Sequence, residues 1–264
     1  MTRLDATFSA LRSAGRKALV PFVTAGDPAL DATVPVLHAL VAAGADVLEL
    51  GVPFSDPMAD GPVIQRSSER ALARGAGLSY VFGVVREFRA TDDKTPIVLM
   101  GYLNPVEIRG AHAFVAEAAA AGVDGVLLVD LPPEEATELR EALASRGLAL
   151  ILLASPTTAA PRLARLCADA RGYLYYVSFA GVTGASERLD SSAAGERLRL
   201  LRSRSSAPVV AGFGIKDAAS AAAMAVDADG VVVGSALVSA IGETADPVAA
   251  AAGFLKPLRE ALDR

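Results

Sequence analysis

Two acidic residues, one in an apolar run and one in the loop behind it, are the side chains best suited to acid–base chemistry. Glu49 lies within the run at residues 46–52, and Asp60 follows in the loop at 53–61, which also carries Asp56. A buried strand carboxylate and a loop carboxylate can hold different pKa values, so that one acts as acid where the other stays ionised. Two alternatives stay open: Glu49 in a buried ion pair with an arginine, and Asp60 as the cap of a helix beginning near Pro62.

Glycines late in the sequence predict a phosphate site. Gly212, Phe213 and Gly214 end one apolar run, and Gly234 and Ser235 end the next, just before a short helical stretch at 236–241. Backbone N–H groups at glycines, together with a helix amino terminus, bind phosphate without needing a lysine. The alternative is that these glycines only form turns.

The composition excludes several other kinds of chemistry. The chain has 264 residues, 52% of them hydrophobic, with a formal net charge of -5, one cysteine and two histidines. So few thiols and imidazoles leave too few soft ligands for a metal site, and we expect no metal. With no long apolar run and no basic, aromatic cluster, we expect a cytoplasmic protein that binds neither membrane nor nucleic acid.

Eight apolar runs along the chain must position the acidic residues and the glycines described above. Helical segments separate the runs from one another. Their nearly continuous apolar character is typical of strands covered on both faces. Eight strand–helix units in 264 residues average 33 residues each, which predicts an α/β fold, a (β/α)8 TIM barrel. A doubly wound open sheet is the runner-up. The runs are residues 18–25, 46–52, 96–102, 125–131, 148–155, 173–179, 208–213 and 230–233.

We expect residues 1–264 to form one domain, with an extra helix before the first strand and long loops after strands 2 and 6. Strand alternation turns Val47, Glu49 and Gly51 towards the barrel axis, and Leu48 with Leu50 towards the helices. The active site of such a barrel lies at the carboxyl ends of its strands.

Residues 48–61, Leu-Glu-Leu-Gly-Val-Pro-Phe-Ser-Asp-Pro-Met-Ala-Asp-Gly, resemble the signature of the tryptophan synthase alpha subunit. Supporting matches lie at residues 21–28, 100–105, 130–132, 175, 181–184, 212–214 and 234–235. The resemblance implies a TIM-barrel lyase of tryptophan biosynthesis that cleaves indole-3-glycerol phosphate to indole and glyceraldehyde 3-phosphate. It implies no cofactor in this subunit. It also implies an α2β2 assembly with a beta subunit that carries pyridoxal phosphate.

The same resemblance assigns roles to individual residues. Glu49 becomes the general acid or base, and Asp60 stabilises positive charge on the indole nitrogen. Tyr175 lies beside the glutamate, and Thr183 and Gly184 belong to a closing loop in which Thr183 bonds Asp60. The indole slot comprises Phe22, Ile64, Met100, Leu127 and Val129; the phosphate site comprises Gly212, Phe213, Gly214, Gly234 and Ser235; and the face towards the beta subunit comprises Pro53, Asp56, Pro57, Asn104 and Pro132.

One departure from the family pattern concerns the closing loop. Phe179 and Ala180 stand where the family often has Arg-Ser, and loss of that arginine would weaken loop closure or signalling to a partner. This departure suggests one alternative, a stand-alone lyase that supplies free indole. A separate alternative is a catalytically weak partner that activates a beta subunit.

Overall fold

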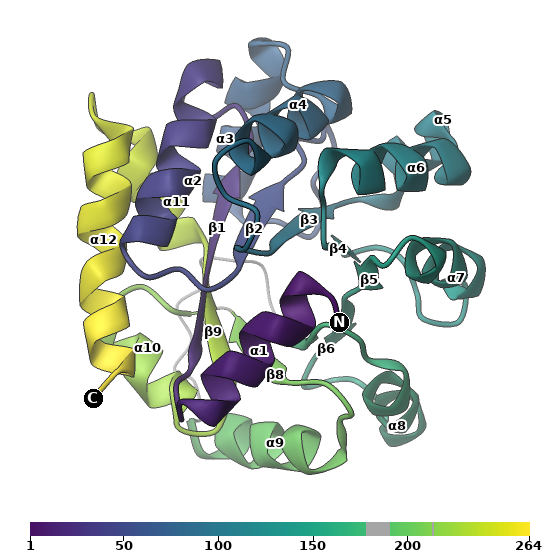
Figure 1. The fold of residues 1–264 in the computed structure, drawn as a ribbon. Helices are drawn as coiled ribbons and strands as arrows, with labels where there is room; N and C mark the ends of the chain where they lie inside the picture. Colours follow the sequence, from purple (N-terminus) through teal and green to yellow (C-terminus); the bar gives the residue numbers. More distant parts are fainter. Residues whose placement is uncertain (178–190, 213) are drawn as a thin grey trace.

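A parallel barrel forms the centre of the computed structural model, which describes residues 1–177, 191–212 and 214–264 (Figure 1). The described strands form one sheet in the order β5-β4-β3-β2-β1-β9-β8-β7-β6, and neighbouring strands in it pair in parallel. Their bounds are β1 Ala18–Thr24, β2 Leu48–Gly51, β3 Ile97–Gly101, β4 Gly125–Leu128, β5 Ala149–Leu150, β6 Leu152–Ala154, β7 Leu174–Val177, β8 Val209–Gly212 and β9 Gly230–Val233.

The fifth apolar run closes the barrel. It is divided at Ile151 into β5, which pairs with β4, and β6, which pairs with β7. The two ends of the sheet therefore meet in one short segment, and the Ile151 N–H still bonds the Val126 carbonyl at 2.8 Å. The TIM barrel is confirmed, and the doubly wound open sheet is wrong because this one segment joins both ends of the sheet.

Helices surround the strands (Figure 1). They are α1 Arg3–Ser13, η1 Leu30–Ala32, α2 Thr33–Ala42, α3 Pro62–Ala73, α4 Leu78–Arg89, α5 Leu103–Arg109, α6 Ala111–Ala121, α7 Thr137–Ser145, α8 Ala160–Asp169, α9 Ser191–Arg204, α10 Ala218–Ala225, α11 Ser235–Gly242 and α12 Pro247–Leu262. Among the described helices, none is long and apolar enough to cross a membrane.

The expected extra helix is α1, which lies across the amino end of the barrel. A capping box at Thr2 begins it, and its apolar face buries Leu4, Phe8 and Leu11 among the inward-facing side chains of the strands. Arg3 anchors it by an ion pair of 3.0 Å with Asp124, just before β4. This helix closes the amino end of the barrel and leaves the carboxyl end for chemistry. The organisation of residues 1–264 as one domain stays a prediction.

Alternation along β2 follows the prediction. Val47 packs with the inward-facing side chains, whereas Leu48 and Leu50 pack in the outer core shared by strands and helices. Glu49 therefore faces the barrel interior.

Candidate active site

Glu49 is a fully buried carboxylate that has no counter-ion among the residues that the structure describes. Its side chain is 0% exposed, and no described arginine or lysine lies within ion-pair distance of it. The Tyr173 hydroxyl donates to Oε1 at 2.5 Å, while Oε2 has no hydrogen-bond partner among the described residues. Burial raises the pKa of Glu49 to about 7, and the Tyr173 hydrogen bond opposes that rise. Among the described residues no arginine forms the ion pair of the alternative interpretation, and the group is poised to exchange a proton near neutral pH.

Two tyrosines of the β7 segment lie near this carboxylate. The family resemblance predicted that Tyr175 lies beside Glu49. The hydrogen bond to Glu49 comes instead from Tyr173, which the sequence analysis did not name. Tyr175 is buried too; its pKa is well above the ordinary range, mainly through burial and then through the charges of Glu49 and Asp60. It therefore lies within the field of both carboxylates. The two-residue spacing of the tyrosines, which turns both to one face of a strand, is the signal that could have revealed Tyr173.

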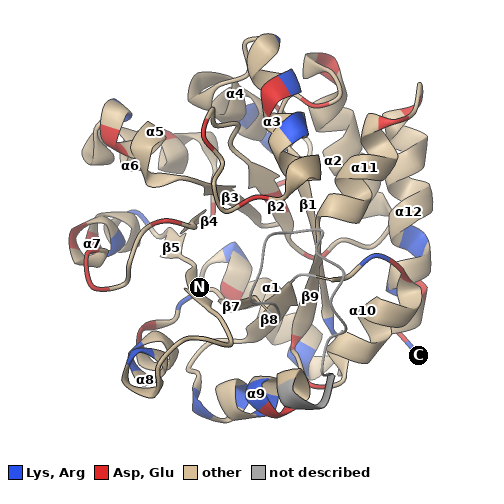
Figure 2. Cartoon of the chain, turned by 180° about the vertical axis from the view of Figure 1, so that it is seen from behind, with Lys and Arg blue, Asp and Glu red and all other residues tan. Residues whose placement is uncertain are grey.

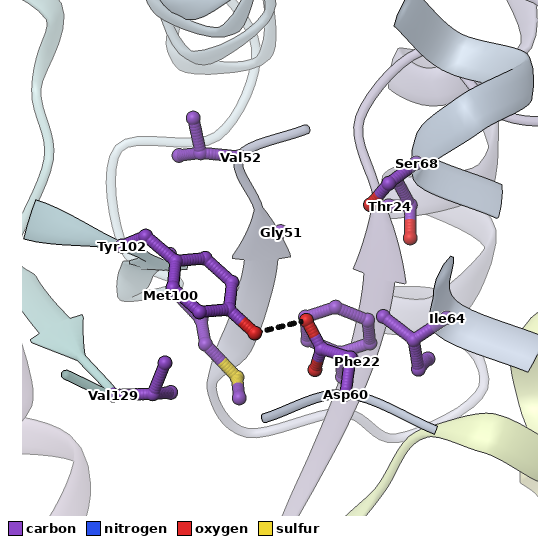
Figure 3. Close-up of a pocket in the computed structure, with 11 residues that line it drawn as sticks. Phe22, Thr24, Gly51, Val52, Asp60, Ile64, Ser68, Met100, Tyr102 and Val129 are labelled. Atoms are coloured by element: carbon purple, nitrogen blue, oxygen red, sulfur yellow. Dashed lines mark hydrogen bonds between the residues drawn. The ribbon is translucent and has the colours of Figure 1, made fainter. Parts of the chain in front are cut away.

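Asp60 is held over the barrel by Tyr102. The Tyr102 hydroxyl donates to Oδ2 of Asp60 at 2.9 Å and accepts the Ala59 N–H at 3.0 Å (Figure 3). Gly61 is the N-cap of α3 and receives no side-chain cap bond, so the alternative of Asp60 as a helix cap is wrong. Burial raises the pKa of Asp60, and the bond from Tyr102 acts in the opposite direction. Tyr102 also fixes the loop itself, since its ring stacks on Phe54 at a centroid distance of 5.0 Å.

Tyr102→Phe is expected to raise the pKa of Asp60, because it removes the donor that favours the ionised carboxylate. The acid limb of the kcat/KM profile should therefore move to higher pH. At pH 6 the loss of one charge-assisted hydrogen bond should lower kcat/KM roughly 10-fold. Tyr80→Phe, which removes a tyrosine hydroxyl bonded to Thr33 and Leu30, is the matched control. An unchanged acid limb in Tyr102→Phe would show that Tyr102 does not tune Asp60.

A cleft beside Asp60 has the apolar walls expected of an indole slot. Its empty volume is about 280 Å³, part of it open to solvent. Of the five residues predicted for this slot, four line it: Phe22, Ile64, Met100 and Val129 (Figure 3). Leu127 does not; it is buried in the barrel interior. Glu49 does not line the cleft either, although Gly51, the next residue on its face of β2, does.

The predicted phosphate site adjoins this cleft. Gly234 is the N-cap of α11 and Ser235 its first residue, so the first amides of that helix are free of intrahelical partners. A Cβ added to Gly234 would lie 3.7 Å from Cβ of Phe22, so this helix terminus borders the apolar slot. Gly214 has a φ of +77°, whereas Gly212 faces inward, where a Cβ would meet the Tyr175 hydroxyl at 2.0 Å. Gly212 thus leaves room for that tyrosine.

Some predicted residues lie outside the described part of the chain. They are Phe213 of the phosphate site, Thr183 and Gly184 of the closing loop, and the unusual pair Phe179 and Ala180. The bond from Thr183 to Asp60 therefore stays a prediction.

The residues predicted to meet a partner differ in accessibility. Asp56 and Asn104 are exposed, and Pro57 and Pro132 are partly so, but Pro53 is buried and cannot offer its side chain to a partner. Two exposed apolar side chains in these same segments were not among the residues predicted to meet a partner. Met58 is 79% exposed and Ile108 is 80% exposed. Large exposed apolar side chains mark contact surfaces when they cluster.

The described residues offer no alternative metal-based chemistry. Among them, no three His, Cys, Asp or Glu side chains gather in a way that could hold a metal ion. Cys167 is buried, and burial raises the pKa of its thiol, so it is a poor nucleophile.

A closed parallel barrel with two carboxylates, an apolar cleft and a helix terminus at its carboxyl end defines a TIM-barrel enzyme of the acid–base type. Comparisons with known proteins narrow the class. The sequence pattern of the family "Tryptophan synthase alpha chain" matches residues 8–260, and the chain belongs to that family.

Individual relatives agree over the full length. The tryptophan synthase alpha chain of Xanthomonas axonopodis pv. citri is 71% identical over 267 residues, with 100% of each chain covered. The crystal structure of tryptophan synthase subunit alpha from Legionella pneumophila has a TM-score of 0.93 at 46% identity and covers 100% of this chain and 99% of its own. A tryptophan synthase structure from Mycobacterium tuberculosis has a TM-score of 0.90 at 36% identity, with 99% and 98% covered.

Proposed function

We propose that Glu49 and Asp60 divide the acid–base work of indole-3-glycerol phosphate cleavage, the lyase reaction of tryptophan biosynthesis that belongs to this family. The observation that carries the proposal is the environment of Glu49. Glu49 is buried, has no ion-pair partner in the described part of the chain and has a pKa of about 7, below a cleft that Asp60 lines. A group with that pKa is present in both protonation states near neutral pH, as a proton shuttle must be.

The reaction needs a proton donor on one side of the substrate and an anion on the other. Protonation of the indole ring carbon that bears the glycerol chain allows the carbon–carbon bond to break. The adjacent hydroxyl then loses its proton and becomes the aldehyde of glyceraldehyde 3-phosphate. Glu49 gives the first proton and takes the second, so that it ends the cycle as it began. Asp60 stabilises the positive charge that develops on the ring nitrogen.

Glu49 must move to take part, because its carboxylate is not among the groups that line the cleft. The hydrogen bond from Tyr173 to Oε1 holds the carboxylate in the barrel interior, while Oε2 has no hydrogen-bond partner among the described residues. A turn of the side chain about its own torsions would carry the carboxylate towards the cleft. Tyr173 thus acts as a positioning residue for the resting state.

Substrate orientation follows from the two ends of the cleft. Phe22, Ile64, Met100 and Val129 surround the indole ring and exclude water from it. The amides at the start of α11, which follows β9, and Gly214, which follows β8, bind the phosphate through backbone groups and the helix dipole. This arrangement needs neither metal nor cofactor, and pyridoxal phosphate belongs to the partner.

The proposal includes a beta subunit, which forms an α2β2 assembly with this chain in the cytoplasm. The beta subunit contacts the loop that carries Asp56, Pro57 and Met58. It also contacts Asn104, Ile108 and Pro132. Because the contact loop is also the loop that carries Asp60, a bound partner would order the catalytic carboxylate directly. We therefore expect activation of cleavage when the partner binds.

The deciding experiment is a steady-state assay of indole release with and without the beta chain of the same organism. A rise in kcat/KM of about 10-fold or more on addition of that chain is expected, since one ordered charge-assisted contact is of that size. Ile108→Ser should weaken this activation and leave the activity of the isolated chain unchanged, with Val226→Ser, an exposed valine far from the loop in sequence, as control. Full turnover without a partner would instead support the stand-alone lyase.

A further inference from the structure

A second cavity lies at the amino end of the barrel, away from the catalytic carboxylates. The residues that line it come from the second half of α1, the connection to β1, the end of α9 and the residues that precede β8 and β9. Figure 1 shows where α1, α9, β8 and β9 lie in the fold. Its empty volume is about 490 Å³, part of it open to solvent. Nothing in the proposed reaction uses it.

The charge of this cavity is opposite to that of the chain. Arg12, Arg16, Lys17 and Arg202 line it, and Asp229 is the carboxylate among the described residues of the lining. Basic positions on α9, the helix that carries Arg202, are blue in Figure 2. The whole chain has a formal net charge of -5. Four cations around one cavity of an acidic protein create a local positive potential that attracts anions.

Two of these cations already have partners, and two are available. Arg202 bonds Asp229 at 2.9 Å, and Arg16 bonds Asp263 at 3.0 Å. Lys17 donates only to the Ala228 carbonyl at 2.6 Å, and Arg12 has no side-chain hydrogen bond or ion pair in the described part of the chain. Burial, and then the charge of Arg202, lower the pKa of Lys17. An anion placed here would relieve that repulsion.

The rest of the lining is apolar. Phe8 and Leu11 from α1 and Pro208 before β8 form a wall next to the cations. A ligand that uses both halves carries an anionic group on a compact apolar body. The mixture of cations that can make charge-assisted hydrogen bonds and a hydrophobic wall is typical of small-molecule sites.

We propose that this cavity binds a small organic anion, with its phosphate or carboxylate on Arg12 and Lys17 and its apolar body against Phe8, Leu11 and Pro208. Phosphate and carboxylate share the chemistry that Arg12 and Lys17 recognise. The site is separate from the proposed phosphate site at α11, since it lies at the other end of the strands.

The test is an NMR titration of the full-length protein with phenyl phosphate, phenylacetate and inorganic phosphate, monitored at the backbone amides of residues 12–17. We expect saturable shifts with phenyl phosphate or phenylacetate, and binding at least about 10-fold weaker for inorganic phosphate, which lacks the apolar body. The relative affinity of the two aryl anions identifies the preferred anionic group.

Arg12→Gln should weaken binding at these amides about 10-fold and leave indole release unchanged. Arg146→Gln is the control, because Arg146 is an exposed arginine after α7 with no side-chain partner among the described residues, and the substitution removes the same charge. Absence of shifts at residues 12–17, equal affinity for inorganic phosphate, or equal binding by Arg12→Gln and the wild type would each overturn the proposal.

Discussion

Glu49→Gln is expected to lower kcat for cleavage of indole-3-glycerol phosphate by about 10²- to 10⁴-fold, the usual contribution of a general acid–base group. The amide has the shape of the carboxylic acid and keeps an oxygen that can accept the Tyr173 hydrogen bond. It cannot give a proton to the ring carbon or remove one from the hydroxyl. Because the side chain does not line the cleft at rest, KM should change much less than kcat.

The measurement is steady-state indole release at pH 7.5, with the partner chain present if it activates the wild type. Glu141→Gln, an exposed glutamate of α7, is the matched control and should retain full activity. Normal turnover by Glu49→Gln would remove Glu49 from the mechanism.

The same substitution is expected to stabilise the protein at alkaline pH by about 3 kcal/mol, since the pKa of Glu49 rises from an ordinary 4.5 to about 7 on folding. A carboxyl group with a raised pKa binds its proton more tightly in the folded state. Stability is therefore lost as the pH rises from the unfolded pKa towards the folded one, and the loss is complete above pH 7. Glutamine is neutral throughout and avoids this cost.

Urea unfolding at pH 8 and at pH 5.5 tests whether the stability gain of Glu49→Gln over the wild type increases with pH. The free energy of unfolding of Glu49→Gln should exceed that of the wild type by about 3 kcal/mol at pH 8, and by about half of that at pH 5.5. Glu141→Gln, measured alongside, is the matched control for loss of a glutamate. A gain that is equal at both pH values would mean that ionisation of Glu49 is not its source.

The barrel follows from local pattern, because each buried strand is a short apolar run whose neighbours in sequence are its neighbours in space. Alternation along β2 likewise predicts that Glu49 faces inward. The division of the fifth run at Ile151 could not be predicted, since closure of the sheet, and not the composition of the run, causes it.

The immediate surroundings of the carboxylates were harder to predict. Tyr173 is separated from Glu49 by 124 residues, and Tyr102 from Asp60 by 42, so no spacing rule joins them. Leu127 and Pro53 have the residue types expected of a slot and a contact face, but packing buries both. Burial of a single apolar residue depends on the strands and loops above it, which the sequence pattern does not place to within one layer.

Closure of the barrel also determines when the protein acquires its chemistry. Glu49 lies in the first quarter of the chain, whereas its hydrogen-bond donor Tyr173 comes from the β7 segment. The second pairing partner of β1 is β9, at Gly230–Val233, so β1 is paired on both edges only after β9 has been synthesised. A nascent chain that exposes Glu49 to water therefore carries an ordinary acid with an ordinary pKa. The reactive carboxylate stays latent throughout synthesis and appears only once nearly the whole sequence has left the ribosome.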